Sequence, residues 1–109
     1  MAPPRALVIV GAGGQGREAL DTVEALNAAA SSPVWRFLGF LADDDRTADL
    51  LAARGAAVIG PVARLGDGSL EPDAEVMVAI GDPLARRRVA DEVAAAGRRA
   101  ATLVHPSAQ

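Results

Sequence analysis

Short apolar segments alternate along this chain with segments whose apolar residues recur at helical spacing. Residues 6–10 form a continuous apolar run rich in β-branched side chains, and the run stops at a cluster of glycines. This pattern is typical of a central strand that is covered on both faces. Between residues 17 and 30, Leu20, Val23 and Leu26 recur on one side of a helix. The beginning of the chain therefore predicts a strand, a glycine-rich turn and an amphipathic helix.

The same alternation continues to the end of the chain. Apolar segments predict four further strands, at residues 34–41, 57–59, 75–80 and 101–104. Helices are predicted at residues 47–54 and 83–96, with a single helical turn ending at residue 65 between them. The later helix has a marked start, because Asp82 is a favourable N-cap and Pro83 suits the first helical position.

Strands that alternate with helices favour a parallel sheet with right-handed crossovers. We therefore expect an α/β fold: one Rossmann-like, three-layer domain over residues 1–109, with a five-stranded, mainly parallel sheet in the order 3-2-1-4-5. Ligands of such sheets bind outside the carboxyl ends of the strands, at the point between the first and fourth strands. Loops 11–16 and 81–82 flank this point, and the acidic run 43–45 follows the neighbouring strand. Three features of the sequence thus converge on one edge of the sheet.

The composition removes several classes of function. The 109 residues include no Cys and a single His, which excludes a disulfide framework and thiol catalysis and predicts no metal site. All eleven basic residues are Arg, so a P-loop lysine and Schiff-base chemistry are excluded. The net charge of −3 gives no electrostatic footprint for nucleic acid. No segment approaches the roughly 20 apolar residues of a membrane span. We expect a cytoplasmic domain without a nucleic-acid or membrane partner.

A glycine-rich loop is the first candidate site. Gly11, Gly13 and Gly16 match the spacing G-x-G-x-x-G between a predicted strand and a predicted helix. Glycines let the backbone approach a pyrophosphate, and a helix N-terminus offers it free N–H groups and a partial positive charge. Within the loop, Gln15 is a neutral donor and acceptor for a phosphate or a sugar hydroxyl. The alternative is a tight strand-to-helix turn that binds no ligand, with Gln15 in solvent.

Polar residues elsewhere are further candidates. Asp43 and Asp44 are placed to accept hydrogen bonds from a ribose or a base, or to cap the following helix. Asp82 lies at the same edge, where an N-cap is also close enough for a ligand contact. The three arginines at 86–88 begin one turn inside a helix, so two of them are expected to face solvent. His105 precedes a proline and fits a structural turn. No catalytic residue is predicted.

Five ordered motifs resemble one protein family. They are, in chain order, LVIVGAGGQGRE (7–18), LGFLADD (38–44), VIGP (58–61), VAIGDP (78–83) and ATLVHPSA (101–108). Together they are similar to the amino-terminal PglD-type domain of bacterial sugar acetyltransferases, the sialic acid O-acetyltransferase and UDP-4-amino-sugar N-acetyltransferase group. The resemblance covers nearly the whole chain. It implies a Rossmann-like domain that binds the UDP-sugar acceptor.

The resemblance also implies roles for individual residues. The implied substrate-binding residues are Gly11, Gly13, Gly14, Gln15, Gly16, Asp43, Asp44, Gly81 and Asp82. The glycine loop is expected against the pyrophosphate or the sugar, the two neighbouring aspartates near the uridine, and the last two residues in the facing wall. The family commonly has His where this chain has Gln15, so a titratable donor near the sugar is replaced by a neutral one.

The catalytic part of such proteins is expected to lie outside this chain. In the family, a left-handed β-helix of hexapeptide repeats follows this domain, forms a homotrimer, binds acetyl-CoA and carries the catalytic His. The sequence contains no hexapeptide repeat, so we expect no cofactor on this chain and acceptor binding without turnover. Two alternatives stay open. One is a small NAD(P)-binding domain of the oxidoreductase type, and the other is a non-catalytic dimerisation module.

Overall fold

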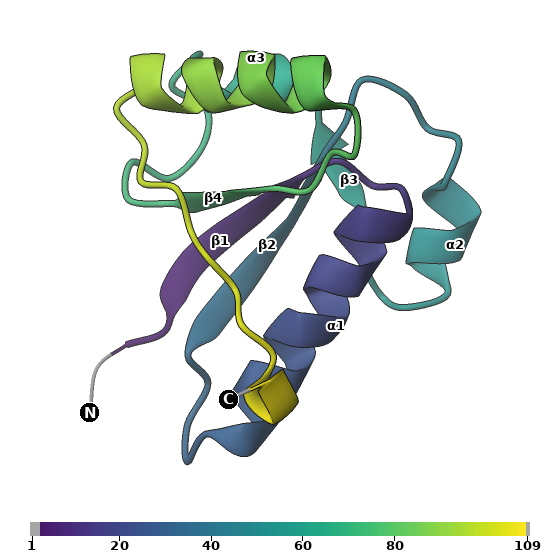
Figure 1. Ribbon diagram of the computed structural model, residues 1–109, viewed down its shortest axis with the longest axis vertical. Coiled ribbons are helices and arrows are strands. Elements are labelled where there is room, and N and C mark those ends of the chain that lie inside the picture. Colours follow the sequence, from purple (N-terminus) through teal and green to yellow (C-terminus); the bar gives the residue numbers. More distant parts are fainter. Residues whose placement is uncertain (1–2, 109) are drawn as a thin grey trace.

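A four-stranded parallel sheet lies at the centre of the molecule (Figure 1). The computed structural model describes residues 3–108. The strands lie in the order β3-β2-β1-β4 and are β1 (Arg5–Val10), β2 (Trp35–Leu41), β3 (Val58–Gly60) and β4 (Glu75–Val78). The helices are α1 (Gly14–Ala29), α2 (Ala48–Ala52) and α3 (Pro83–Ala95), with 3-10 turns η1 (Val62–Leu65) and η2 (Pro106–Ala108).

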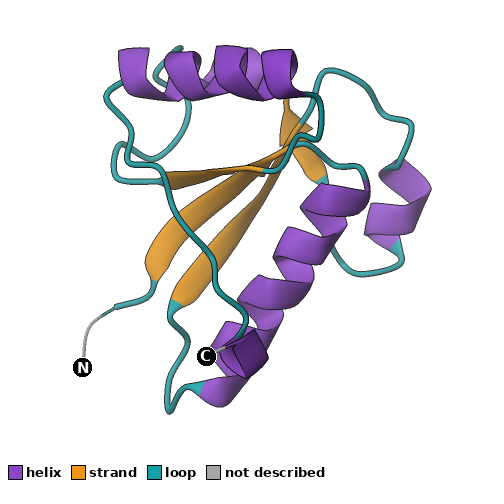
Figure 2. Cartoon of the chain, in the orientation of Figure 1, coloured by secondary structure: helices purple, strands orange, loops and turns teal. Residues whose placement is uncertain are grey.

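The central strand β1 divides its side chains between two cores. Leu7 and Ile9 are fully buried in the core that contains the apolar face of α1. Val8 and Val10 are fully buried in the core that contains the apolar face of α3. Successive strand residues point to opposite faces, so a continuous apolar run is what a strand between two helical layers requires. Burial of each such side chain contributes roughly 1.5–3 kcal/mol. The expected three layers are visible in Figure 2.

Strand β2 carries a bulge beside β1. Leu38 has no partner in the register of the two strands, so the alternation of faces shifts by one residue at this point. Phe37 and Phe40 therefore share a face, and their rings meet edge to face with centroids 5.1 Å apart. Gly39 adopts φ 145°, and a Cβ there would lie 2.5 Å from the Ile59 side chain. This position of the bulge therefore requires glycine.

At the amino ends of the strands, a buried carboxylate is fully paired. Glu75 is 5% exposed, and its two oxygens accept hydrogen bonds from Nε and Nη2 of Arg5, both at 2.6 Å. The same guanidinium lies 4.4 Å from the ring centroid of Trp35. A bidentate pair that also stacks on an aromatic ring holds β1, β2 and β4 together at this end.

Asn27 joins the end of α1 to the start of β2. Its amide nitrogen donates to the Trp35 carbonyl at 2.9 Å, and its amide oxygen accepts from the backbone N–H groups of Val34 and Trp35 at 3.0 and 2.9 Å. One side chain thus satisfies three backbone groups of the connection between helix and strand.

The prediction of five strands is wrong in its last strand: within the described residues the sheet has four. On the side of β4 away from β1, the described residues form a single bridge, in which the Val76 N–H donates to the Arg99 carbonyl at 3.0 Å and the Val76 carbonyl accepts from the Ala101 N–H at 2.8 Å. The chain then leaves the sheet and runs to η2, which lies against α1 (Figure 1). Ala101 and Leu103 pack on the α1 side of the core. The alternating apolar residues of segment 101–104 are therefore explained by packing in the core beneath α1, and not by pairing as a fifth strand.

The other predicted strands and helices are present with shifted boundaries. The order of the first four strands is confirmed. Helix α1 begins at Gly14, three residues before the predicted start, and β4 ends two residues early at Val78. Asp82 caps α3 as predicted, because its carboxylate accepts from the Ala85 N–H at 2.9 Å. Among residues 3–108, no helix is long and apolar enough to cross a bilayer.

Candidate functional site

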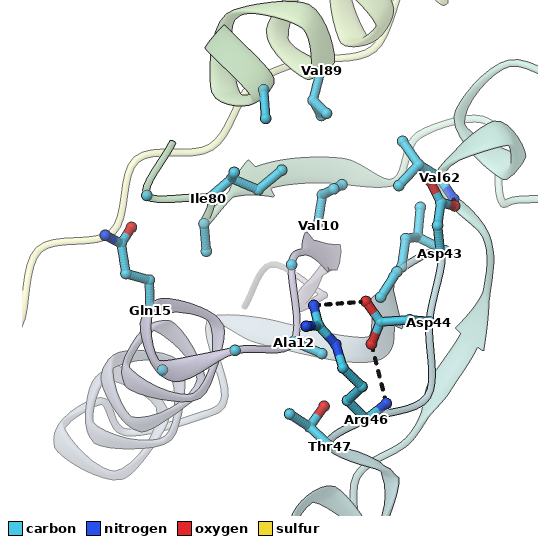
Figure 3. Close-up of a pocket in the computed structure, with 18 of the residues that line it drawn as sticks. Val10, Ala12, Gln15, Asp43, Asp44, Arg46, Thr47, Val62, Ile80 and Val89 are labelled. Atoms are coloured by element: carbon cyan, nitrogen blue, oxygen red, sulfur yellow. Dashed lines mark hydrogen bonds and ion pairs between the residues drawn. The ribbon is translucent and has the colours of Figure 1, made fainter. Parts of the chain in front are cut away.

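A cavity of about 680 Å³ opens at the carboxyl ends of β1, β2 and β4 (Figure 3). Its apolar walls come from residues that also belong to the α3-side core, among them Val10, Leu41 and Val89. Seven of the nine residues predicted to bind substrate line it: Gly11, Gly13, Gly14, Gln15, Asp43, Asp44 and Gly81. The topology thus brings three distant loops together at the point where parallel sheets bind ligands.

The glycine loop presents open backbone to this cavity. Gly13 is the N-cap of α1, and no side chain among residues 3–108 caps this helix. The first N–H groups of α1 therefore have no intrahelical acceptor. A Cβ built at Gly13 or Gly14 would meet no atom within 4 Å. The glycine backbone is therefore open on its Cβ side and lines the cavity, which suits the approach of a phosphate group that the sequence predicts.

Gly16 does not line the cavity. It is buried, and a Cβ at this position would lie 1.9 Å from the carbonyl oxygen of Gly11 and 3.3 Å from the Phe40 ring. The third glycine of the motif therefore lets α1 pack closely on the end of β1. In this structure its role is in helix-to-strand packing, away from the ligand space.

Asp82 also lies outside the cavity lining, because its carboxylate faces the first turn of α3 as the N-cap. Its neighbour Gly81 does line the cavity, opposite Gln15. The Gln15 amide nitrogen lies 3.1 Å from the place that a Cβ of Gly81 would occupy. Gln15 thus reaches across the rim from α1 to the loop before α3, and a larger residue at 81 would displace its side chain.

The two aspartates after β2 are already engaged within the protein. Asp43 Oδ1 accepts from the Val62 N–H at 2.9 Å, which ties the end of β2 to η1. Asp44 accepts from the Arg46 backbone N–H at 3.0 Å and from its guanidinium at 3.1 Å. These hydrogen bonds to Arg46 lower the pKa of the Asp44 carboxyl below its ordinary value. Both carboxylates therefore stabilise the conformation of the loop after β2 through hydrogen bonds within the protein.

Two cationic residues of the lining were not among the predicted binding residues: sequence reasoning missed Arg46, and it considered Arg88 only as part of the arginine run at 86–88. Helical spacing could have indicated that Arg88 faces the cavity. It follows Ala85 by three positions and precedes the buried Val89, so it lies close to the apolar side of α3 that faces the sheet. Nothing in the linear sequence signals Arg46, whose orientation depends on the turn that Asp44 forms. Within residues 3–108, no group of His, Cys, Asp and Glu is arranged to hold a metal ion.

Comparison with known proteins agrees with the motifs. The family described as the PglD N-terminal domain matches residues 6–93. None of the curated proteins matches the chain. A solved structure of the acetyltransferase domain of PglB from Neisseria gonorrhoeae, in complex with acetyl coenzyme A, is 32% identical with a TM-score of 0.68, over 95% of this chain and 45% of that one.

A second structure of that acetyltransferase domain is 36% identical with a TM-score of 0.66, over 94% of this chain and 45% of the other. The chain thus spans a little under half the length of these solved proteins. The resemblance found in the sequence is confirmed, and the comparisons do not favour an oxidoreductase or a dimerisation module. This chain belongs to the PglD N-terminal domain family.

Proposed function

We propose that this domain binds the nucleotide-sugar acceptor, of the UDP-amino-sugar class, for a sugar O- or N-acetyltransferase. The observation that carries the proposal is the cavity at the carboxyl edge of the sheet, with the uncapped start of α1 open to it. The family membership and the two related acetyltransferase structures support the same assignment.

The lining of the cavity suits the parts of such a ligand. A diphosphate is the group best matched by the free backbone N–H groups at Gly13 and Gly14. The apolar walls around Val62 and Ile80 offer surface for a base or a sugar ring. Gln15, at the rim, provides a neutral donor and acceptor for a sugar hydroxyl. We expect the nucleoside on the side of Asp43 and the sugar toward the rim.

The proposed role of this domain is recognition, with acetyl transfer assigned to a further domain. The family resemblance implies that acetyl-CoA, the catalytic His and the trimer contacts belong to a carboxyl-terminal β-helix. From its composition, we expect this domain in the cytoplasm. We therefore expect this chain to bind the acceptor without acetylating it.

The experiment that tests the proposal is a calorimetric titration of the chain with UDP, with NADH and acetyl-CoA as comparison ligands. We expect a binding signal from UDP alone. Gly13→Val places two methyl groups in the open space before α1 and should weaken UDP binding by about tenfold or more. Gly66→Val is the matched control, since it also adds a side chain to open space, outside this cavity.

Two results would contradict the proposal. UDP binding that survives Gly13→Val unchanged would remove the glycine loop from the site. Absence of UDP binding with a clear NADH signal would favour the dinucleotide alternative instead.

A further inference from the structure

Arg46 is a cationic side chain held at the wall of the cavity. It follows the acidic run after β2, and its side chain is 84% exposed. Figure 3 shows it extending from that loop toward the cavity, on the side of Ala12 in the glycine loop. Two hydrogen bonds to one carboxylate, that of Asp44, fix both its backbone and its guanidinium.

Stability of the fold does not explain this arrangement. Both partners of the ion pair are at least half exposed, and exposed pairs of this kind contribute little to folding free energy. The pair instead restricts a long side chain that would otherwise occupy many rotamers in solvent. A restricted cation beside a cavity is prepared for an anion, because part of the ordering entropy is lost before the ligand arrives.

The hydrogen-bonding groups of the cavity point to the same ligand chemistry. Both oxygens of Asp44 already accept from Arg46, and one oxygen of Asp43 accepts from Val62. A guanidinium has five N–H donors, and only one Arg46 side-chain bond occurs among the described residues. The remaining donors, with the free N–H groups of the glycine loop, leave the cavity rich in donors. An anionic ligand with several acceptor oxygens satisfies them.

We propose that Arg46 contacts the phosphates of the nucleotide and so selects nucleoside diphosphates over nucleosides, and that Asp44 is its positioning residue. The proposal rests on the proposed function and deepens it. It assigns Asp44 to the orientation of Arg46, in place of the contact with uridine that the family resemblance implies. The phosphates would then lie between Arg46 and the start of α1.

The test compares the affinities of UDP and uridine for four proteins: the wild type, Arg46→Gln, Asp44→Asn and Arg36→Gln. Arg36 is the matched control, because it is also an exposed arginine paired with a carboxylate, that of Glu71, and it lies outside the cavity. We expect Arg46→Gln to weaken UDP binding about tenfold and to reduce its salt dependence, with uridine binding within about twofold of wild type. Arg36→Gln should leave both affinities unchanged.

Asp44→Asn distinguishes a positioning role of Asp44 from a purely electrostatic one, because the two roles predict opposite changes in UDP affinity. Removal of a negative charge from the cavity would by itself strengthen the binding of an anion. Loss of the group that holds Arg46 should instead weaken UDP binding several-fold, while uridine binding stays the same. Far-ultraviolet circular dichroism of each variant checks that the fold is retained.

Each contrary result has its own meaning. If the wild type binds UDP and Arg46→Gln binds it equally well, the inference about Arg46 fails and the proposed function stands. If Asp44→Asn weakens UDP and uridine alike, Asp44 contacts the nucleoside and its positioning role is overturned. If the wild type binds neither ligand, the proposed function fails together with this inference.

Discussion

The two ends of the parallel sheet differ in how their polar groups are bonded. At the amino ends, Glu75 and Arg5 satisfy each other in a fork, and Asn27 satisfies three backbone groups. At the carboxyl ends, the first N–H groups of α1 have no cap, and Arg46 retains donors without a partner among the described residues. The polar groups of the amino end are used in internal bonds, whereas at the carboxyl end the aspartates are bonded internally and N–H donors of α1 and Arg46 remain available to a ligand.

This contrast suggests that residues at the amino ends of the strands determine stability, and that residues around the cavity determine ligand recognition. Substitutions at the amino ends should cost folding free energy and leave ligand affinity intact. Substitutions that face the cavity should do the reverse. The following four predictions test this separation.

Gly16→Ala should give the largest loss of unfolding free energy. Gly16 lies at the carboxyl end of the sheet, yet its role is in packing, so it is an exception to the separation of stability from recognition. The added Cβ would lie 1.9 Å from the Gly11 carbonyl oxygen, so α1 must move away from β1. We expect a loss of about 3 kcal/mol in unfolding free energy, measured by urea denaturation. Gly14→Ala is the control: its Cβ meets nothing within 4 Å, and it should be neutral or slightly stabilising. Equal effects of the two would refute the packing role of Gly16.

Asn27→Ala tests the amino end. The substitution removes three hydrogen bonds at the start of β2 and leaves their backbone partners unsatisfied, so we expect a loss of about 2 kcal/mol. UDP affinity, measured by calorimetry, should remain that of the wild type. Thr22→Ala on the same helix removes only an exposed bond to a helical carbonyl and should change stability much less. A drop in UDP affinity for Asn27→Ala would show that the two ends are coupled.

Asp82→Ala tests a residue that is close to the cavity and yet bonded internally. Loss of the cap on α3 should reduce unfolding free energy by about 1 kcal/mol. Asp82→Asn retains an acceptor oxygen and should stay close to wild type. Both should bind UDP normally, and a selective loss of UDP binding would instead identify Asp82 as a ligand contact.

The smallest effect should be a decline in stability at acid pH. Hydrogen bonds from Arg36 and Arg46 lower the pKa values of Glu71 and Asp44 respectively in the folded state. Ionised carboxylates therefore favour the fold, and this contribution is present above the unfolded pKa values of about 4. This contribution should be lost progressively as the pH falls from there through the lowered pKa values of the folded state. Urea denaturation at pH 7 and pH 3 measures the decline, and Glu71→Gln should reduce it.

Most of the fold was predictable because its signals are local. The apolar run of β1 and the helical spacing in α1 each have one favourable structure, and the order of the first four strands follows from their alternation. The fifth strand was not predictable from pattern alone. Ala101 and Leu103 show the period of a strand, but they gain their burial under α1, and this choice depends on tertiary packing.

The candidate site was predictable as a place and less so in its individual residues. Loop positions at the ends of parallel strands follow from topology, so seven of the nine expected residues meet at the cavity. Side-chain orientation does not follow from topology. Gly16 packs against the end of β1, and the Asp82 carboxylate caps α3. The Arg46 side chain extends toward the cavity. These contacts depend on the tertiary structure, and residue spacing along the chain does not encode them.

The stacked tryptophan at the amino end has an optical consequence. Trp35 is the single tryptophan of a chain without tyrosine, so near-ultraviolet absorption and fluorescence emission come almost entirely from one ring. That ring is 5% exposed and covered by Arg5, and emission from such a site shifts to longer wavelength when water reaches it. It lies at the end of β2 remote from the cavity. We therefore expect this ring to serve as a spectroscopic reporter that responds to unfolding and not to a ligand bound at the opposite end of the sheet.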